Sequence, residues 1–296
     1  MLTTKISGLE LKNPLMLAAG IMGTTGGSLK RMARCGAGAV ITKSIGIEPK
    51  PGHPNPTMVK LRCGYLNAMG LPNPSYKLFQ PEIDEAKHAG VPVIASIFGV
   101  DASEFSVIAG AINADAFELN VSCPHAEGYG AEIGTDPALV EGITKAVKNA
   151  TDAPVWVKLT PNVADITETG LAAQKGGADA VVAINTLRGM AIDIESGHPI
   201  LGNRFGGLSG HGIKPVAVKC VHDLYSALDI PVIGCGGISG WEDVVEFIMA
   251  GARAVQIGSA VGDNINIFSD ISSCLEAFLS LKLWTLDDIY GMVHEI

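Results

Sequence analysis

The 296-residue sequence has few charged residues and no concentrated charge of one sign. Charged side chains make up 17% of it, against about 25% in an average soluble domain. No run of lysine and arginine appears, and the net charge is −9. Because binding to a phosphate backbone needs a basic surface, a nucleic-acid partner is excluded. Sparse charge favours a surface partly covered by another subunit, and we expect a homodimer.

Paired cysteines, long apolar runs and metal-binding motifs are also missing. The six cysteines are scattered without a CxxC pair, which is typical of reduced thiols in a cytosolic protein. No apolar run approaches the roughly 18–20 residues of a membrane helix, and the N-terminus lacks a signal-peptide pattern. The seven histidines show no ligand spacing, which argues against a catalytic metal. We therefore expect a soluble, cytoplasmic protein with no membrane contact.

Short apolar runs are abundant, and each is followed by a helical pattern. There are eight, at 14–19, 38–43, 92–97, 115–120, 154–159, 178–184, 231–235 and 252–257. Amphipathic stretches lie between them, for example at 136–149, 213–227 and 241–250. Nearly continuous apolar strands are buried on both faces, as in a parallel sheet covered by helices.

The entries to these strands alternate in chemistry. The odd runs begin at Pro14, Pro92, Pro154 and Pro231, and the even runs follow Gly36, Asn113, Gly177 and Gly251. Because alternate strands fill alternate core layers of a closed eight-stranded barrel, this pattern favours a (β/α)8 TIM barrel. We expect one domain over residues 1–296. An open sheet with ordinary loop residues remains the alternative.

Two predicted strand-to-helix connections are long, about 44–81 after the second strand and 185–212 after the sixth. Both follow carboxyl ends of strands, where barrel enzymes place their active sites. Polar or glycine-rich residues lie at this end of each strand: Ala19–Gly20, Lys43–Ser44, Ser96, Asn120, Lys158, Asn185–Thr186, Gly234–Gly237 and Gly258–Ser259. Buried polar groups need partners, so the pattern predicts a ligand pocket.

Several of these residues indicate particular chemistry. Gly236–Gly237 and Gly258–Ser259 follow the last two strands, the usual phosphate position of a barrel, although a glycine pair also suits a simple tight turn. Lys43 and Lys158 favour an anionic or electron-rich ligand. Two alternatives remain: that these lysines only extend to solvent, or that one of them forms a Schiff base. Cys123 opens a glycine-rich segment after the fourth strand and is a candidate general base.

Eight short motifs carry a family resemblance that covers nearly the whole chain. They are 42–44 (TKS), 67–73 (NAMGLPN), 118–124 (ELNVSCP), 157–161 (VKLTP), 184–186 (INT), 206–215 (GGLSGHGIKP), 235–238 (CGGI) and 256–259 (QIGS). In this order they resemble class 1 dihydroorotate dehydrogenases, and most closely the B-type catalytic subunit. The similar class 2 enzymes carry serine in place of Cys123 and a membrane-associating N-terminal extension, and we expect neither here.

The resemblance implies FMN as cofactor and assigns residues to it. The implied FMN site comprises Ala19, Gly20, Lys43, Ser44, Ser96, Asn120, Lys158, Ile184, Gly210, Gly236, Gly237, Gly258 and Ser259. The implied substrate site comprises Lys43, Asn67, Ala68, Met69, Gly70, Leu71, Asn120, Asn185 and Thr186. Ser96 replaces a usual asparagine and Ser259 a usual threonine, and both retain a hydrogen-bonding side chain.

The implied reaction is oxidation of dihydroorotate to orotate in de novo pyrimidine (UMP) biosynthesis. Cys123 would remove the C5 proton while FMN accepts hydride from C6. The B-type resemblance also implies a heterotetramer with an electron-transfer subunit carrying FAD and an iron–sulfur cluster. Three alternatives remain: an FMN-dependent dehydrogenase of another dihydropyrimidine such as dihydrouracil, a Schiff-base lyase using Lys158, and a flavin-binding module without turnover.

Overall fold

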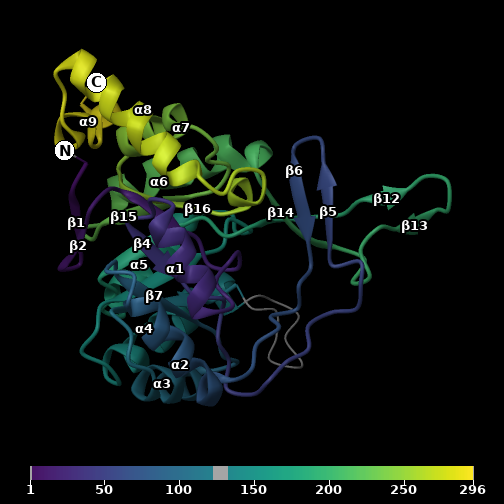
Figure 1. Ribbon diagram of the computed structural model, residues 1–296. Coiled ribbons are helices and arrows are strands. Elements are labelled where there is room, and N and C mark those ends of the chain that lie inside the picture. The colour runs from purple at the N-terminus through teal and green to yellow at the C-terminus, as the bar shows by residue number, and fades with distance from the viewer. Residues whose placement is uncertain (1, 123–132, 296) are drawn as a thin grey trace.

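The computed structural model describes residues 2–122 and 133–295, and in these residues eight parallel strands close into a barrel surrounded by helices (Figure 1). Every one of the eight strands expected from the sequence is present, so the TIM-barrel prediction is confirmed. In order around the barrel they are β3 (Leu15–Leu17), β4 (Ala39–Ile41), β7 (Val93–Ile97), β8 (Ala116–Asn120), β9 (Val155–Leu159), β10 (Ala180–Ala183), β15 (Val232–Cys235) and β16 (Ala252–Ile257).

The alternating strand entries have a hydrogen-bonding explanation. Proline lacks an N–H, but the carbonyls of Pro14, Pro92, Pro154 and Pro231 each accept a backbone N–H from a neighbouring strand. Proline at a strand's first residue therefore breaks no ladder bond. Beside two of these prolines, an aspartate at the entry of an even strand accepts the next N–H: Asp115 from Val93 at 2.7 Å and Asp179 from Val155 at 2.7 Å.

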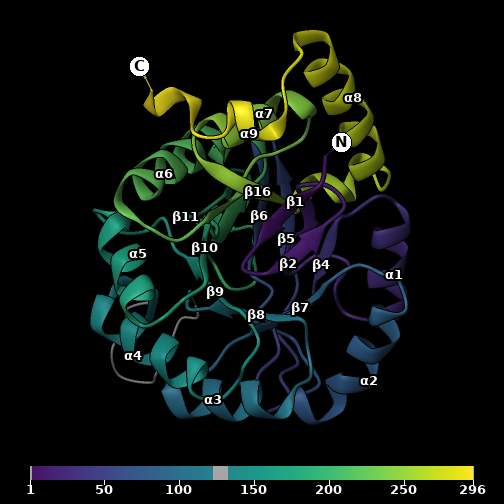
Figure 2. The same ribbon diagram turned by 90° about the vertical axis from the view of Figure 1, so that its left-hand side faces the viewer.

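Helices follow the barrel strands and form a ring around them (Figure 2). They are α1 (Gly26–Arg34), α2 (Tyr76–Lys87), α3 (Ala102–Ala111), α4 (Pro137–Lys148), α5 (Ile166–Lys175), α6 (Lys214–Ala227), α7 (Trp241–Met249), α8 (Ile267–Lys282) and α9 (Leu286–Ile289). Short 3-10 turns occur at η1 (Ile133–Thr135), η2 (His211–Ile213), η3 (Ser259–Gly262) and η4 (Met292–His294).

Side-chain caps fix where several of these helices begin. Asp101, Asp136 and Asp165 accept backbone N–H groups in the first turns of α3, α4 and α5, which satisfies donors that have no partner inside a helix. Gly36, Gly177 and Gly251 lie between a helix and the next strand with positive φ, a conformation that glycine adopts without strain.

The amino-terminal end of the barrel is closed by a hairpin, β1 (Thr4–Ile6) and β2 (Leu9–Leu11), which crosses the centre of the ring in Figure 2. Ile6 and Leu11 pack with inward-facing strand residues, and Trp156 is the largest of these. The Trp156 indole N–H donates to the Ser7 hydroxyl at 3.2 Å. The lower half of the barrel is therefore a filled apolar core.

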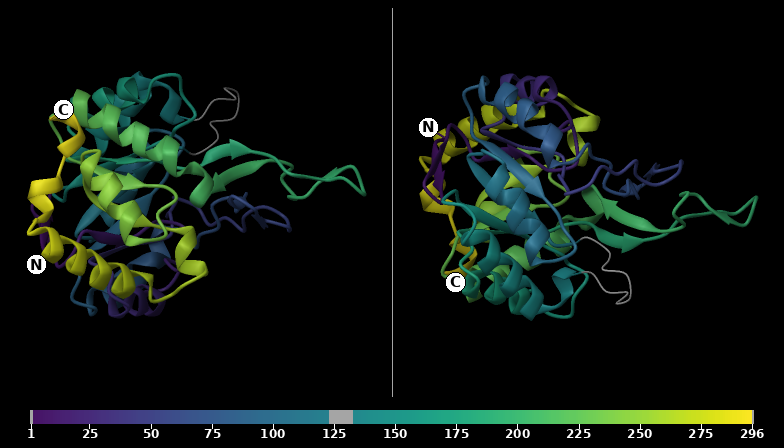
Figure 3. Two further views of the ribbon diagram at one scale, coloured as in Figure 1. Left: turned by 90° about the horizontal axis from the view of Figure 1, so that it is seen from above. Right: turned by 90° about the horizontal axis from the view of Figure 1, so that it is seen from below.

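Two long connections form one projection, which we call the β-arm. It comprises β5 (Met58–Leu61), β6 (Gly64–Asn67), β11 (Leu187–Gly189), β12 (Ile192–Asp193), β13 (His198–Pro199) and β14 (Gly206–Ser209). β6 pairs with β14, which joins the connection after β4 to the connection after β10. The β-arm extends from the barrel end opposite the chain termini (Figure 3).

The first connection ends earlier than the sequence predicted. We expected it to reach residue 81, but α2 begins at Tyr76 and contains Pro81. Ser75 caps this helix, and Phe79, Ile83 and Ala86 form its buried face. The helix tolerates Pro81 because burial of this face stabilises it despite the missing backbone donor.

Candidate active site

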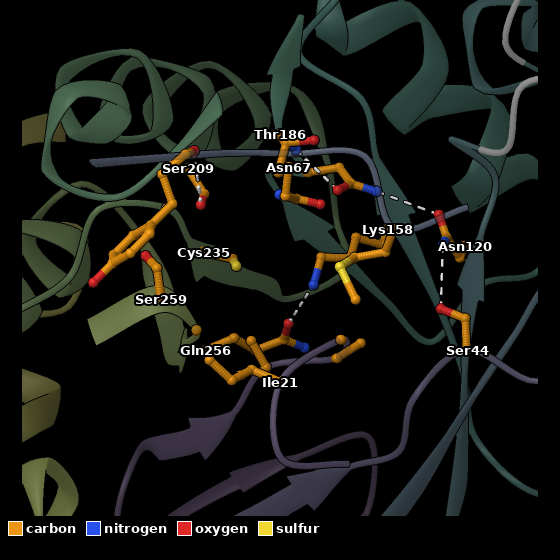
Figure 4. Close-up of a pocket in the computed structure, with 18 of the residues that line it drawn as sticks. Ile21, Ser44, Asn67, Asn120, Lys158, Thr186, Ser209, Cys235, Gln256 and Ser259 are labelled. Carbon is orange, nitrogen blue, oxygen red and sulfur yellow. Dashed lines mark hydrogen bonds between the residues drawn. The ribbon is translucent and has the colours of Figure 1, made fainter. Parts of the chain in front are cut away.

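One pocket of about 580 Å³ opens at the carboxyl ends of the barrel strands, beneath the β-arm (Figure 4). Its size is typical of small-molecule sites. Every residue predicted to hold the cofactor lines it: Ala19, Gly20, Lys43, Ser44, Ser96, Asn120, Lys158, Ile184, Gly210, Gly236, Gly237, Gly258 and Ser259. The structure thus brings together residues from most of the barrel strands.

The predicted substrate residues lie in the same pocket, with one exception. Besides Lys43 and Asn120, the lining includes Asn67, Met69, Gly70, Leu71, Asn185 and Thr186. Ala68 is not among the lining residues, and its place in the substrate site stays a prediction. It lies between Asn67 and Met69, and its backbone N–H donates to the Thr57 carbonyl at 2.8 Å.

The predicted base, Cys123, lies outside the described residues. Asn120, three residues earlier, ends β8 and lines the pocket. The role of Cys123 therefore stays a prediction.

A chain of side-chain hydrogen bonds orders one wall of the pocket. Asn185 Nδ2 donates to Asn120 Oδ1 at 3.3 Å, and Asn120 Nδ2 donates to Ser44 Oγ at 3.2 Å. Ser44 Oγ is in turn 3.0 Å from Ser96 Oγ. Figure 4 shows Asn120 and Ser44 aligned on this wall. Because these bonds fix the side-chain amides of Asn120 and Asn185, the amide donors and acceptors that remain point in defined directions and can orient a ligand.

Three buried polar side chains form the floor of the pocket. Lys158 Nζ donates to Gln256 Oε1 at 2.8 Å and lies 3.5 Å from Glu118 Oε1, while Gln256 Nε2 donates to Glu118 Oε2 at 2.5 Å. The three residues come from β9, β16 and β8. Each accepts or donates within the group, which satisfies charges that would otherwise be costly to bury.

The charge state of Lys158 follows from these contacts. Burial disfavours the ammonium, but the Cys235 sulfur and the Glu118 carboxylate outweigh burial, and the pKa of Lys158 lies above its ordinary value. Burial also raises the pKa of the Cys235 thiol, against the opposing effect of Lys158. Glu118 is the carboxylate partner of Lys158, with its Oε1 3.5 Å from the Lys158 Nζ.

Lys43 has a different environment. It is half-buried in the pocket wall, and in residues 2–122 and 133–295 no carboxylate forms an ion pair with it. Burial lowers the pKa of its ammonium, because desolvation disfavours the charged form. An anionic group in the pocket would supply the missing counter-charge.

The opposite end of the pocket is built from backbone. Gly236 and Gly237 have φ of 130° and 78°, in the region that favours glycine. A Cβ on Gly237 would lie 2.9 Å from the Lys214 backbone nitrogen and 3.0 Å from the Gly210 carbonyl oxygen. Gly258 immediately precedes η3, at the end of the adjacent strand β16. Glycine turns of this kind allow backbone N–H groups to approach a phosphate closely.

The sequence analysis assigned no role to several lining residues. Glu118 and Gln256 lie two residues before Asn120 and Gly258, which were predicted to line the pocket. Side chains two residues apart on a strand point to the same face, so this spacing was the signal that Glu118 and Gln256 also point inward. Met58, Tyr65 and Ser209 line the pocket from the β-arm. No sequence signal placed them there, because they belong to long connections.

Two kinds of feature are absent from the part of the chain that the structure describes. No group of three or more His, Cys, Asp or Glu side chains there is arranged to hold a metal ion. No helix of these residues combines the length and apolar character needed to cross a membrane.

Comparison with known proteins identifies the family. The family model for dihydroorotate dehydrogenase matches residues 1–279. A protein of Methanocella arvoryzae is 63% identical over 296 residues, which cover 100% of this chain and 98% of the relative. Proteins of Methanosarcina acetivorans (65% identity, 98% of this chain and 96% of the relative) and Pyrococcus furiosus (51%, 99% and 98%) are also similar. All three are named dihydroorotate dehydrogenase B (NAD(+)), catalytic subunit. The chain therefore belongs to the dihydroorotate dehydrogenase family.

Proposed function

We propose that the protein oxidises dihydroorotate to orotate in de novo pyrimidine biosynthesis, with FMN as cofactor. The observation that carries this proposal is the single pocket in which a glycine-lined end, two lysines and three asparagines come together. The names of the relatives, over full-length alignments, support the same reaction.

The donors and walls of the pocket fit FMN. Gly236, Gly237, Gly258 and Ser259 would hold its phosphate at the glycine-lined end. Lys158, Lys43 and Ser44 offer donors to the electron-rich edge of a flavin ring, and Ala18, Ile21 and Ile184 provide apolar walls. When bound, FMN supplies a hydride acceptor.

The asparagines and Lys43 suit a dihydropyrimidine carboxylate. Side-chain amides of Asn67, Asn120 and Asn185 both donate and accept, which matches the alternating N–H and C=O groups of the ring. Lys43 would bind the carboxylate, and Thr186 and the segment Met69–Leu71 would enclose the ring. Cys123 would remove the C5 proton, which is acidic because it lies α to a carbonyl.

The first test is the visible spectrum of the purified protein. We expect bound flavin absorbance that bleaches when dihydroorotate is added without oxygen, because hydride transfer reduces the flavin. Dihydrouracil is the matched control, since it lacks the carboxylate that Lys43 would bind, and it should bleach the flavin far more slowly. Faster bleaching by dihydrouracil would overturn the substrate assignment, and a colourless protein would overturn the cofactor.

The structure gives a reason to disfavour the Schiff-base alternative. A Schiff-base lysine must be an unprotonated amine to attack a carbonyl. Lys158 is instead held as an ammonium by Glu118 and Gln256, and its pKa is raised. Its position suits a fixed positive charge better than a nucleophile.

A second prediction concerns the pH dependence of ligand binding. Only the charged form of Lys43 attracts the carboxylate of orotate, and burial lowers its pKa in the free protein. Orotate affinity should therefore fall as pH rises, beginning at a lower pH than an ordinary lysine would give. Titrating orotate binding against pH tests this. The Lys43→Met variant should bind weakly with no such pH dependence, and an unchanged profile in that variant would contradict the assignment.

We also propose that the protein works within an assembly. The relatives are named as catalytic subunits of an NAD-linked enzyme, which supports a homodimer joined to an electron-transfer subunit carrying FAD and an iron–sulfur cluster. Large apolar side chains are exposed on the β-arm: Met58, Met190, Ile192, Ile194 and Phe205. Exposed apolar patches of this kind mark protein interfaces.

A further inference from the structure

Asp243 lies in the first turn of α7 and is buried, with 8% of its surface exposed. Its two oxygens have different partners. Oδ2 accepts from Ser239 N at 2.8 Å, Ser239 Oγ at 3.1 Å and Gly240 N at 3.0 Å. Oδ1 accepts from Lys214 Nζ at 2.8 Å. One carboxylate thus links α6 to the turn that precedes α7.

That turn, Gly236–Gly240, begins with the two glycines of the pocket. At this end Gly237 lies against Lys214, since a Cβ added to Gly237 would be 2.7 Å from the Lys214 Cβ. The backbone and Cβ of Lys214 therefore lie against the start of the turn. The ammonium of Lys214 binds Asp243. The turn is held between the first residue of α6 and the first turn of α7.

These contacts exceed what a helix cap requires. A capping residue needs to satisfy one or two backbone donors, whereas Asp243 also binds the Ser239 hydroxyl and an ammonium. Burial disfavours its carboxylate, but Lys214 and the backbone N–H groups of Ser239 and Gly240 more than offset burial, so the pKa of Asp243 is below its ordinary value. Near neutral pH Asp243 is an anion paired with Lys214, which limits its repulsion of a nearby phosphate.

We propose that Asp243 is a positioning residue for the cofactor phosphate. Through its bonds to Ser239, Gly240 and Lys214 it fixes the Gly236–Gly240 turn in the conformation that presents backbone N–H groups to the phosphate. The inference rests on the proposed function, because it takes FMN as the ligand of this pocket. It concerns the phosphate end alone and assigns Asp243 no contact with the flavin ring.

The test compares two flavins that differ only in the phosphate. Asp243→Asn keeps the side chain's shape but places an N–H₂ group or a neutral oxygen against the donors of the turn. Full-length protein reconstituted with FMN or with riboflavin would be titrated by quenching of flavin fluorescence. We expect the FMN dissociation constant to rise about tenfold or more, the size of an effect from losing a charged hydrogen-bond partner. The riboflavin constant should change less than about threefold.

Glu246→Gln is the matched control. Glu246 also binds Lys214, at 2.7 Å, but among the described residues it forms no side-chain hydrogen bond with the turn. Its FMN and riboflavin constants should both stay near those of the unmodified protein. If Asp243→Asn folds poorly, Ser239→Ala removes one bond to Asp243 and should give a smaller loss confined to FMN.

The outcomes separate this inference from the function on which it rests. Equal losses of FMN and riboflavin affinity would show that Asp243 supports the fold in general, and an unchanged FMN constant would show that the turn does not depend on it. Either result overturns the inference alone. Failure of the unmodified protein to bind FMN more tightly than riboflavin would overturn the phosphate site itself.

Discussion

Replacing Cys123 with alanine should leave a protein that still binds flavin but is reduced by dihydroorotate at least about 100-fold more slowly, the lower range for loss of a general base. The residues predicted to hold the flavin do not include Cys123, so the cofactor content should be unaffected. Without a base, the C5 proton would have to leave to water. Anaerobic stopped-flow absorbance of the flavin measures the rate directly.

Two further variants sharpen this prediction. Cys274→Ala removes an exposed cysteine on α8 and should leave the rate unchanged. Cys123→Ser should recover activity as pH rises, because a hydroxyl is a much weaker acid than a thiol and less of it is in the anionic form that accepts a proton. A Cys123→Ala rate equal to that of the unmodified protein would remove Cys123 from the mechanism.

Replacing Trp156 with alanine should lower the free energy of unfolding by about 3–5 kcal/mol, the range for large aromatic truncations in a core. Trp156 is fully buried in the lower barrel, where its ring contacts the cluster that includes Ile6 and Leu11 of the closing hairpin. The neighbouring barrel strands cannot move inward to fill the space, because their hydrogen bonds fix the barrel's diameter. Equilibrium unfolding in urea measures the change.

The hydroxyl partner of Trp156 provides the control. Ser7→Ala removes the acceptor of the indole N–H and the hydroxyl that donates to the Asp179 carbonyl at 2.9 Å. It should lower the free energy of unfolding by about 1–3 kcal/mol, the effect of leaving buried polar groups unpaired. If Trp156→Ala were no less stable than Ser7→Ala, the indole would not fill the apolar core in the lower half of the barrel.

The barrel could be predicted from the sequence because its strands are distinctive. Both faces of each strand are buried, so the runs are nearly continuously apolar. The prolines that open alternate strands mark the first residue, where no ladder donor is needed. Helix α2 was placed too late, since Pro81 resembles a break and only tertiary burial of Phe79 and Ile83 reveals the helix. The hairpin β1–β2 and the strands of the β-arm were missed because they are short and only partly apolar.

The site could be predicted residue by residue only where a motif marked a strand end. Lys158 was placed in the pocket, but its charge state depends on Glu118 and Gln256, which come from strands far away in sequence. The sequence holds their identities, and only closure of the barrel brings them within hydrogen-bonding distance. The same is true of Asp243, whose partner Lys214 belongs to the preceding helix.

The pairing of β6 with β14 has a consequence for how the enzyme can diversify. The Asn67 amide donates to the Gly207 carbonyl at 3.2 Å across 140 residues of sequence, so the two insertions form one sheet over the barrel mouth. A length change in either insertion alone would leave unpaired strand edges in the other. Descendants with altered substrate preference would therefore have to remodel both insertions together, while the barrel beneath could remain untouched.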